Sequence, residues 1–281
     1  EAWTERYVSS TTLQRAFVRS ARARPLRFLF SDAAKPHVTR WRALVGSIAL
    51  ARALRGRWAG QAHVGILLPP SVGGALVNIA AAFARRTSVN LNYTAGSAGM
   101  SSAAQQATLR TVVTSRVFLE KAKLEVPTGV ELLWIDEIVA EIGLFERAFA
   151  TLLACSAPVT WIERACGAAP EDAAEGVATV IFSSGSTGEP KGVMLTHANI
   201  ASNCAMLEQA FHVAPREKVL GVLPFFHSFG YTATIWFPAL SGLGAVYHPS
   251  PIDAPAIGAL LERHAISFVL ATPTLLSIYL R

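Results

Sequence analysis

The chain is poor in cysteine and in charged residues. Its three cysteines, Cys155, Cys166 and Cys204, are too few and too irregularly spaced for a disulfide or zinc framework, which favours a reducing, cytoplasmic compartment. Only 16% of the 281 residues are charged and 52% are hydrophobic, so disorder is excluded. This length and composition predict one large or two modest domains around a well-filled core.

Uninterrupted apolar runs of membrane-spanning length are also missing. The two best candidates, residues 63–84 and 219–244, are broken by proline, glycine, histidine or asparagine and lack flanking charged anchors. They are better explained as buried strand and helix pairs. The amino end, "EAWTERYVSS", has no apolar core of a signal peptide and no initial Met, so we expect the chain to derive from a longer protein.

Two kinds of catalytic signature are absent: a Gly-x-Ser-x-Gly nucleophile elbow and a cluster of metal ligands. The net charge of +6 is unevenly distributed, since residues 1–57 carry +9 and the remainder −3. This basic segment is either a surface for an acidic carrier protein, anionic lipid or nucleic acid, or simply a solvated amphipathic helix. Without interleaved aromatics or a nucleic-acid-binding motif, we expect no nucleic acid partner.

Apolar runs and amphipathic segments alternate along most of the chain. Such alternation predicts parallel sheets covered by helices. Ser71 and Thr196 are expected to cap two of the helices. The acidic segment 166–176 is the one linker candidate. The predicted strands are 63–69, 110–115, 131–136, 177–184, 218–225, 244–248 and 267–273. The predicted helices are 13–23, 40–55, 71–86, 116–124, 136–153, 196–212, 234–244 and 254–265.

The stretch "IFSSGSTGEPKGVML", residues 181–195, contains three glycines, four hydroxyl side chains and one lysine between two apolar runs. Glycines let a backbone approach a ligand, and successive N–H groups can hold an anion. A Walker A loop would instead read Gly, four residues, then Gly-Lys-Ser/Thr, and would lead into a helix. Here Lys191 is followed by an apolar run, so the sequence predicts a phosphate-binding loop that joins two strands.

This loop resembles the signature loop of the adenylate-forming enzymes, which include acyl-CoA synthetases, luciferases and adenylation domains. "LPFFHSFG" (223–230) is similar to the next motif of that family, and "HVGILLPPSVGGALVNIAAAFARR" (63–86) to its amino-lobe strand and helix. The resemblance covers most of residues 12–281. It implies an α/β fold with two stacked, helix-covered, largely parallel sheets, one lobe spanning 62–210 and the other 1–61 with 211–281.

The resemblance also implies a two-step reaction. A carboxylate attacks the α-phosphorus of ATP to give acyl-AMP and pyrophosphate, and an acyl-carrier-protein or CoA thiol then takes the acyl group. Lys191, Thr187 and His227 would be catalytic, and Phe226, His227 and Gly230 would line the acyl pocket. The nucleotide would be held by Ser183, Ser184, Gly185, Ser186, Thr187, Gly188, Lys191 and Gly192.

Within the family, "NLNYTAG" (90–96), "TVVTSRVFLEK" (111–121), "FFHSFGYT" and "YHPSP" (247–251) look most like an acyl-[acyl-carrier-protein] synthetase module. That module is often fused to a 2-acylglycerophosphoethanolamine acyltransferase, which would put the protein at the inner face of the membrane. The family's magnesium-binding Glu, ribose-binding Asp and carboxy-terminal domain would follow residue 281. We therefore expect a partial amino-terminal domain with little or no turnover of its own.

Two alternatives remain. His248 and Asp253 have the His-x4-Asp spacing of glycerolipid acyltransferases, in which such a pair acts as a general base. Their proline-rich surroundings, and the lack of the companion Gly- and Arg-containing motif, argue against that role. A non-catalytic module that uses the basic residues 1–57 on a carrier protein or membrane is the second alternative. His197, which opens a helix, is expected to be structural.

Overall fold

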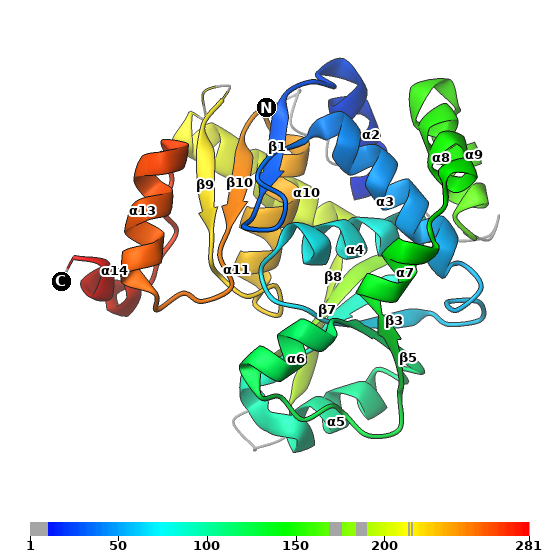
Figure 1. Cartoon of the computed structure of the whole chain (residues 1–281), viewed down its shortest axis with the longest axis horizontal. Helices are drawn as coiled ribbons and strands as arrows, with labels where there is room; N and C mark the ends of the chain where they lie inside the picture. Colours follow the sequence, from blue (N-terminus) through cyan, green and yellow to red (C-terminus); the bar gives the residue numbers. More distant parts are fainter. Residues whose placement is uncertain (1–10, 169–175, 184–189, 213, 215, 281) are drawn as a thin grey trace.

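A computed structural model describes residues 11–168, 176–183, 190–212, 214 and 216–280. Two sheets organise the chain, and helices cover their faces (Figure 1). This arrangement confirms the predicted α/β class with two helix-covered, largely parallel sheets.

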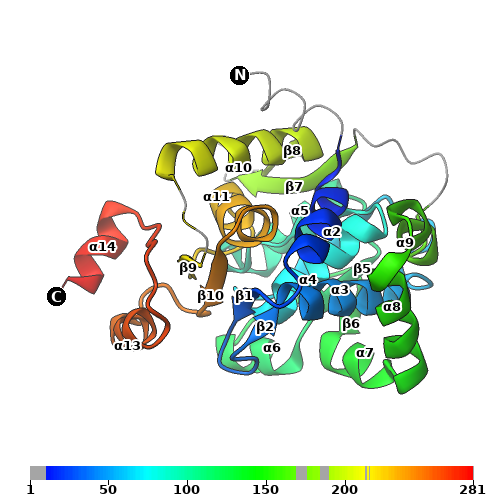
Figure 2. The same ribbon diagram turned by 90° about the horizontal axis from the view of Figure 1, so that it is seen from above.

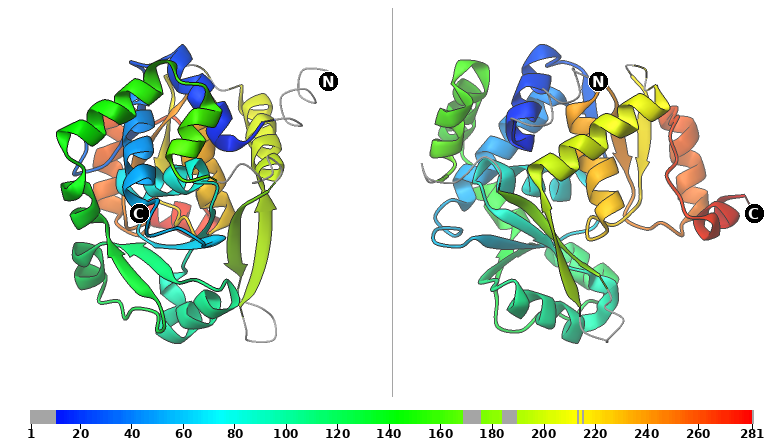
Figure 3. Two further views of the ribbon diagram at one scale, coloured as in Figure 1. Left: turned by 90° about the vertical axis from the view of Figure 1, so that its right-hand side faces the viewer. Right: turned by 180° about the vertical axis from the view of Figure 1, so that it is seen from behind.

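The six-stranded sheet has the strand order β6-β5-β3-β4-β7-β8. Every neighbouring pair is parallel except β7 and β8, which form an antiparallel hairpin at one edge (Figure 3). Its strands are β3 (His63–Leu67), β4 (Thr87–Asn90), β5 (Thr111–Thr114), β6 (Glu131–Trp134), β7 (Val177–Ser183) and β8 (Lys191–Thr196).

The four-stranded sheet has the order β2-β1-β10-β9 and pairs strands from residues 28–39 with strands from residues 218–247. β1 pairs in parallel with β10, which pairs in parallel with β9, and the short β2 is antiparallel to β1. Its strands are β1 (Phe28–Ser31), β2 (Val38–Thr39), β9 (Lys218–Gly221) and β10 (Gly244–Tyr247).

The main hydrophobic core lies between the two sheets, where α3 (Arg40–Leu54) packs along α4 (Val72–Phe83). Figure 2 shows these two helices in the middle of the molecule, with α10 along its upper edge. A second core fills the space between the other face of the six-stranded sheet and α5 (Gly96–Gln106) with α6 (Arg116–Ala122). On the outer side of β9, α13 (Ala254–His264) and α14 (Pro273–Tyr279) enclose a smaller apolar cluster.

The remaining helices follow the chain around these layers. Before β7 the chain forms α2 (Leu13–Ala23), η1 (Tyr93–Ala95), α7 (Ile135–Glu141), α8 (Leu144–Ser156) and α9 (Val159–Ala165). After β8 come α10 (His197–Phe211), then α11 (Ser228–Tyr231), the π-helical turn η2 (Thr232–Trp236) and α12 (Phe237–Leu240). No helix in the described part of the chain is both long and apolar enough to cross a bilayer.

Local signals in the sequence correctly predicted where two helices begin. The Ser71 side chain accepts a hydrogen bond from the Gly74 N–H at 3.0 Å, and Thr196 forms a capping box with Asn199. These contacts need only residues three apart, so they can be recognised without the fold.

Two predicted elements were wrong in detail. The single helix expected over residues 136–153 is two helices, because Ile142 and Gly143 adopt extended backbone and the Ile142 side chain is buried. The strand expected over residues 267–273 is reduced to one bridge between Phe268 and Val219, since Thr272 already caps α14.

Many of the arginines in the basic first 57 residues stabilise the interior instead of covering a solvated face. Arg40 is fully buried, and its guanidinium donates to the backbone oxygens of Pro238, Ala239, Ser241 and Leu243 at 2.6–3.1 Å. It thereby satisfies carbonyls at the end of α12 that have no partner within the helix. Arg22 does the same for α8, donating to Leu153, Ala154 and Ala157.

Candidate functional site

The predicted phosphate loop connects β7 and β8, and its strand-to-strand setting is confirmed. Ser183 pairs with Lys191 and Phe182 with Gly192, so the two ends of the loop lie side by side. The Lys191 side chain is exposed. A Cβ atom on Gly192 would lie 3.2 Å from the Phe182 ring and 3.0 Å from Val180, so a larger residue would crowd this pairing.

Five predicted site residues lie outside the described part of the chain. These are Ser184, Gly185, Ser186, Thr187 and Gly188. Their roles, like those of the flanking Ser183, Lys191 and Gly192, stay predictions.

The second predicted motif forms a tight turn between β9 and α11. Phe226 is buried, whereas His227 next to it is exposed and its N–H donates to the Pro224 carbonyl at 3.1 Å. A Cβ atom at Gly230 would lie 2.2 Å from that same carbonyl oxygen, so the turn requires glycine at this position. Partial burial lowers the pKa of His227 below its ordinary value, which favours the neutral imidazole.

An aromatic cluster holds this turn against the six-stranded sheet. The Tyr93 ring meets the Phe226 ring edge-on, with centroids 4.8 Å apart, and also meets Phe118 edge-on at 5.2 Å. Burial raises the pKa of Tyr93 to about 12, so its hydroxyl remains protonated at neutral pH. Sequence reasoning quoted Tyr93 only as part of a family motif and gave it no role.

The sheet topology brings the loop and the aromatic–histidine turn to the same edge. β4 and β7 are parallel neighbours, with Val89 opposite Val180. Tyr93 follows the carboxyl end of β4, and the loop follows the carboxyl end of β7. Both therefore lie beyond the edge of the sheet that is formed by the carboxyl ends of its parallel strands. A hydrogen-bond contact of 3.2 Å between Tyr231 and Ser88 further fastens α11 to β4. Ligands of open α/β sheets bind at such carboxyl edges.

His248 and Asp253 do come together. Their Nε2 and Oδ2 atoms are 3.3 Å apart, and the side chains are 20% and 45% exposed. Asp253 Oδ1 also accepts a hydrogen bond from the Ala256 N–H at 3.3 Å, which caps α13. The cap supplies a structural reason for the aspartate that is independent of catalysis.

His197, expected to be structural, is buried at the start of α10. Its Nδ1 accepts a hydrogen bond from the Leu13 N–H at 3.4 Å and so links α10 to α2. Burial and the nearby Arg85 lower the pKa of His197 to about 4, against the opposite influence of Glu163. In the part of the chain that is described, no three His, Cys, Asp or Glu side chains gather into a possible metal site.

A family model for AMP-binding enzymes matches residues 26–281. The chain belongs to the AMP-binding enzyme family. This family is the adenylate-forming superfamily that the loop and the 223–230 motif indicated.

Individual relatives in this family match over shorter stretches. The long-chain-fatty-acid–CoA ligase of Bacillus subtilis is 34% identical over 101 residues, which are 35% of this chain and 18% of that protein. Pyochelin synthetase PchF of Pseudomonas aeruginosa is 38% identical over 108 residues, 37% of this chain but only 6% of that protein. The chain thus spans a small part of the length of these relatives.

Solved structures show the same fold. The amino-terminal domain of FACL13 from Mycobacterium tuberculosis superposes with a TM-score of 0.74 and 20% identity, over 96% of this chain and 65% of that one. O-succinylbenzoate CoA synthetase from Bacillus subtilis, in complex with ATP and magnesium, also gives a TM-score of 0.74, with 19% identity over 95% and 65% of the two chains.

Proposed function

We propose that the protein containing this chain activates a carboxylic acid with ATP and passes the acyl group to a thiol. The observation that carries the proposal is the meeting of two motifs at one sheet edge: the β7–β8 loop ending in Lys191, and the turn bearing Phe226 and His227. Family membership supports ATP as the nucleotide. The related ATP- and magnesium-bound synthetase supports magnesium as the accompanying ion.

The proposed chemistry has two balanced steps. A carboxylate oxygen attacks the α-phosphorus, the bond from this phosphorus to the bridging oxygen breaks, and pyrophosphate leaves. A thiolate then attacks the acyl carbon and AMP leaves with the electron pair of the acyl–oxygen bond. Negative charge on the departing pyrophosphate is the main electrostatic demand, and we assign its neutralisation to Lys191 with hydroxyl and N–H donors from Ser184, Ser186 and Thr187.

We propose that His227 and Phe226 face the carboxylate and the adenylate. A neutral imidazole can donate one hydrogen bond to a carboxylate oxygen without forming a competing salt bridge. The buried Phe226 ring and the half-buried Tyr93 ring would supply one apolar wall for the acid. Magnesium ligands are not assigned, because the described residues contain no cluster that suits the ion; those expected after residue 281 remain a prediction.

The substrate and acceptor are the finer part of the proposal. We propose a fatty acid, in keeping with the apolar stretch 225–237, and either an acyl carrier protein or CoA as the thiol. Fusion to a membrane acyltransferase and a place at the inner membrane face stay part of this proposal. The two-lobe division, 62–210 against 1–61 with 211–281, is supported by the two sheets, whose strands fall within these ranges.

The decisive test is acid-dependent exchange of pyrophosphate into ATP by the full-length gene product, with the 281-residue chain measured beside it. Acetate, medium-chain, long-chain and aryl acids are compared. Exchange with long-chain acids supports the fatty-acyl proposal, and exchange restricted to aryl or short acids would refute it. Failure with every acid would favour a non-catalytic module.

Lys191→Ala should slow this exchange about a hundredfold, the cost of removing one charge-stabilising group. Because the Lys191 side chain is exposed, the melting temperature of the variant should equal that of the unmodified protein. Lys121→Ala, an exposed lysine on α6, is the matched control. Equal exchange rates in the two variants would remove Lys191 from its proposed role.

The contact between His248 and Asp253 favours one rival, a glycerolipid acyltransferase. His248→Ala in the full-length protein separates the two functions. On our proposal, exchange and acyl transfer both persist. Loss of transfer to a lysolipid with intact exchange would instead establish the pair as a transferase base.

A further inference from the structure

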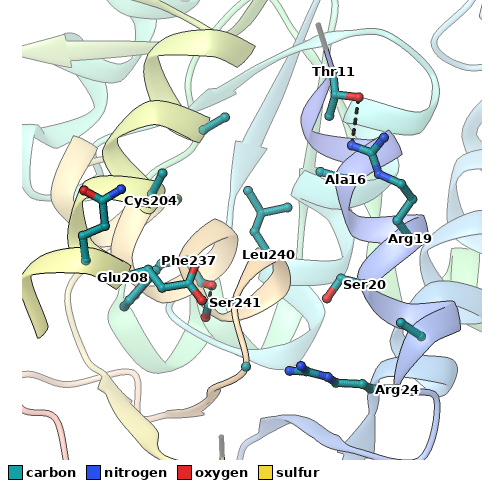
Figure 4. Close-up of a pocket in the computed structure, with 15 residues that line it drawn as sticks. Thr11, Ala16, Arg19, Ser20, Arg24, Cys204, Glu208, Phe237, Leu240 and Ser241 are labelled. Carbon is teal, nitrogen blue, oxygen red and sulfur yellow. Dashed lines mark hydrogen bonds between the residues drawn. The ribbon is translucent and has the colours of Figure 1, made fainter. Parts of the chain in front are cut away.

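Two neighbouring cavities lie away from the proposed adenylation site. The first, of about 510 Å³, lies between α2, α10 and α12 (Figure 4). The second, of about 620 Å³, is bordered by Phe28, Lys218 and Gly244, which begin β1, β9 and β10. Because these strands are parallel, this cavity is at their amino ends, whereas His227 and His248 follow the carboxyl ends. Both volumes are in the range of small-molecule sites, about 300–1,000 Å³.

The two cavities adjoin, because Arg24 and Gly242 line both. A ligand that filled both would pass these two residues. Figure 4 shows Arg24, which directly follows α2, at the end of the first cavity, and Leu240 between the α2 and α10 sides.

The first cavity has a largely apolar lining. Small side chains on the facing helices leave a groove, and larger apolar ones from α12 form its floor. Glu208 stands on the α10 side, across from the arginines of α2 (Figure 4). The apolar lining consists of Ala16, Ala23, Ala201, Ala205, Phe237 and Leu240.

The second cavity is strongly basic. Arg24, Arg27, Arg216 and Lys218 line it, against a single carboxylate, Glu217. Lys218 Nζ donates to the His264 carbonyl at 2.5 Å. Among the described residues, none of the three arginines forms an ion pair with a carboxylate.

Two further observations show that positive charge accumulates here uncompensated. Arg27 Nη1 is shielded from solvent and has no hydrogen-bond partner among the described residues. Behind it lies the fully buried Arg40, whose pKa is lowered to about 10 by burial and by the charges of Arg24 and Arg27. A bound anion would supply the missing acceptor and relieve this repulsion.

We propose that the two adjoining cavities bind an anionic amphiphile: a phosphate head held by Arg24, Arg27 and Arg216, with one alkyl chain along the apolar groove. Leu26, 84% exposed between two of these arginines, would enter the apolar layer when the lipid is presented in a bilayer. Arginine suits this task because its fork of donors matches phosphate oxygens. The site is separate from the adenylation site, so its test does not depend on the proposed enzymatic activity.

Calorimetric titration of the chain with dodecyl phosphate, below its critical micelle concentration, tests monomeric binding. Octyl phosphate should bind much more weakly, by about three- to fourfold for each methylene lost. Dodecyltrimethylammonium, with the same chain and opposite charge, should not bind. Co-sedimentation with phosphatidylglycerol–phosphatidylcholine vesicles tests whether the amphiphile can be a lipid in a bilayer. Vesicles of pure phosphatidylcholine are the control. Binding of either source supports the proposal, and binding of neither overturns it.

Variants locate the site. Arg27→Gln and the exposed Arg216→Gln should each weaken binding about tenfold, the cost of a charge-assisted hydrogen bond. Arg116→Gln removes the same charge from α6 and is the matched control. If it weakens binding equally, the attraction is general electrostatics and the proposal fails.

The alkyl groove has its own pair of variants. Ala205→Trp should fill it and abolish the preference for dodecyl over octyl phosphate, whereas Ala210→Trp, exposed on the same helix, should not. Thermal unfolding checks that each variant is folded. The lipid assignment is overturned if the chain binds poly-glutamate through Arg27 and Arg216 but binds no amphiphile, and if Ala205→Trp has no effect. That result would identify an acidic protein partner.

Discussion

Protonation of His197 should destabilise the protein at mildly acidic pH. The imidazole is 8% exposed, its Nδ1 accepts the hydrogen bond from Leu13, and its pKa is lowered to about 4 by burial and by Arg85. In the unfolded chain a histidine titrates near pH 6.5. Above that pH both states carry the neutral ring, and the contact contributes its full stability.

As the pH falls below about 6.5, the histidine binds a proton in the unfolded state but not in the folded state. The free energy of unfolding therefore decreases. The stability contributed by the neutral His197 is lost almost completely once the pH reaches its folded-state pKa of about 4. A pKa difference of about 2.5 corresponds to roughly 3 kcal/mol over the whole window, of which about 2 kcal/mol is lost by pH 5.

Urea unfolding of the chain and of His197→Gln at pH 8 and pH 5 measures this loss. Glutamine keeps an acceptor for the Leu13 N–H but does not titrate, and all other groups are common to both proteins. The difference in unfolding free energy between the two proteins should therefore fall by about 2 kcal/mol from pH 8 to pH 5. An identical difference at both pH values would show that His197 titrates alike in the folded and unfolded states and would refute the reasoning.

Three further changes test the fold and the site. Arg40→Met should cost about 3 kcal/mol or more in urea unfolding, because it leaves buried carbonyls without donors, whereas the exposed Arg42→Met should cost little; equal losses would contradict this. Gly230→Ala should cost about 2 kcal/mol by the same assay, since its Cβ collides with a backbone carbonyl, and a neutral effect would mean that the turn can relax. Tyr93→Ala should raise the KM for the acid about tenfold with a smaller change in kcat, because Phe226 loses its edge-on support; this rests on the proposed function, and an unchanged KM would place Tyr93 outside the pocket.

Part of the candidate site could be recognised from local sequence. The order of residues 183–192 and the apolar runs on either side predicted a loop between two strands, and β7 and β8 bear this out. Short strands were predicted unevenly. β5, β6, β9 and β10 have four residues each and lie within predicted stretches, whereas β1, β2 and β4 were not predicted. So short a segment shows no clear alternation and is defined largely by its neighbours in the sheet.

The convergence of charges depended entirely on the fold. From the sequence, Arg40 is one of many arginines in a basic segment, yet it donates to carbonyls about 200 residues further along the chain. The same folding leaves Arg24 and Arg27 beside Arg216 without a described carboxylate partner. No pattern of spacing predicts which basic side chains become structural and which remain to meet an anion.

The sequence by itself determined the family, the α/β class, two helix caps and the strand-to-strand setting of the predicted phosphate loop, because each shows in motifs and patterns of residues close together in the chain. Only the tertiary structure decided that Tyr93 supports Phe226, that His248 meets Asp253 beside a helix cap, and that Arg24 lines two neighbouring cavities. Those contacts arise from the order and direction of strands in two sheets, which set neighbours that sequence distance does not reveal.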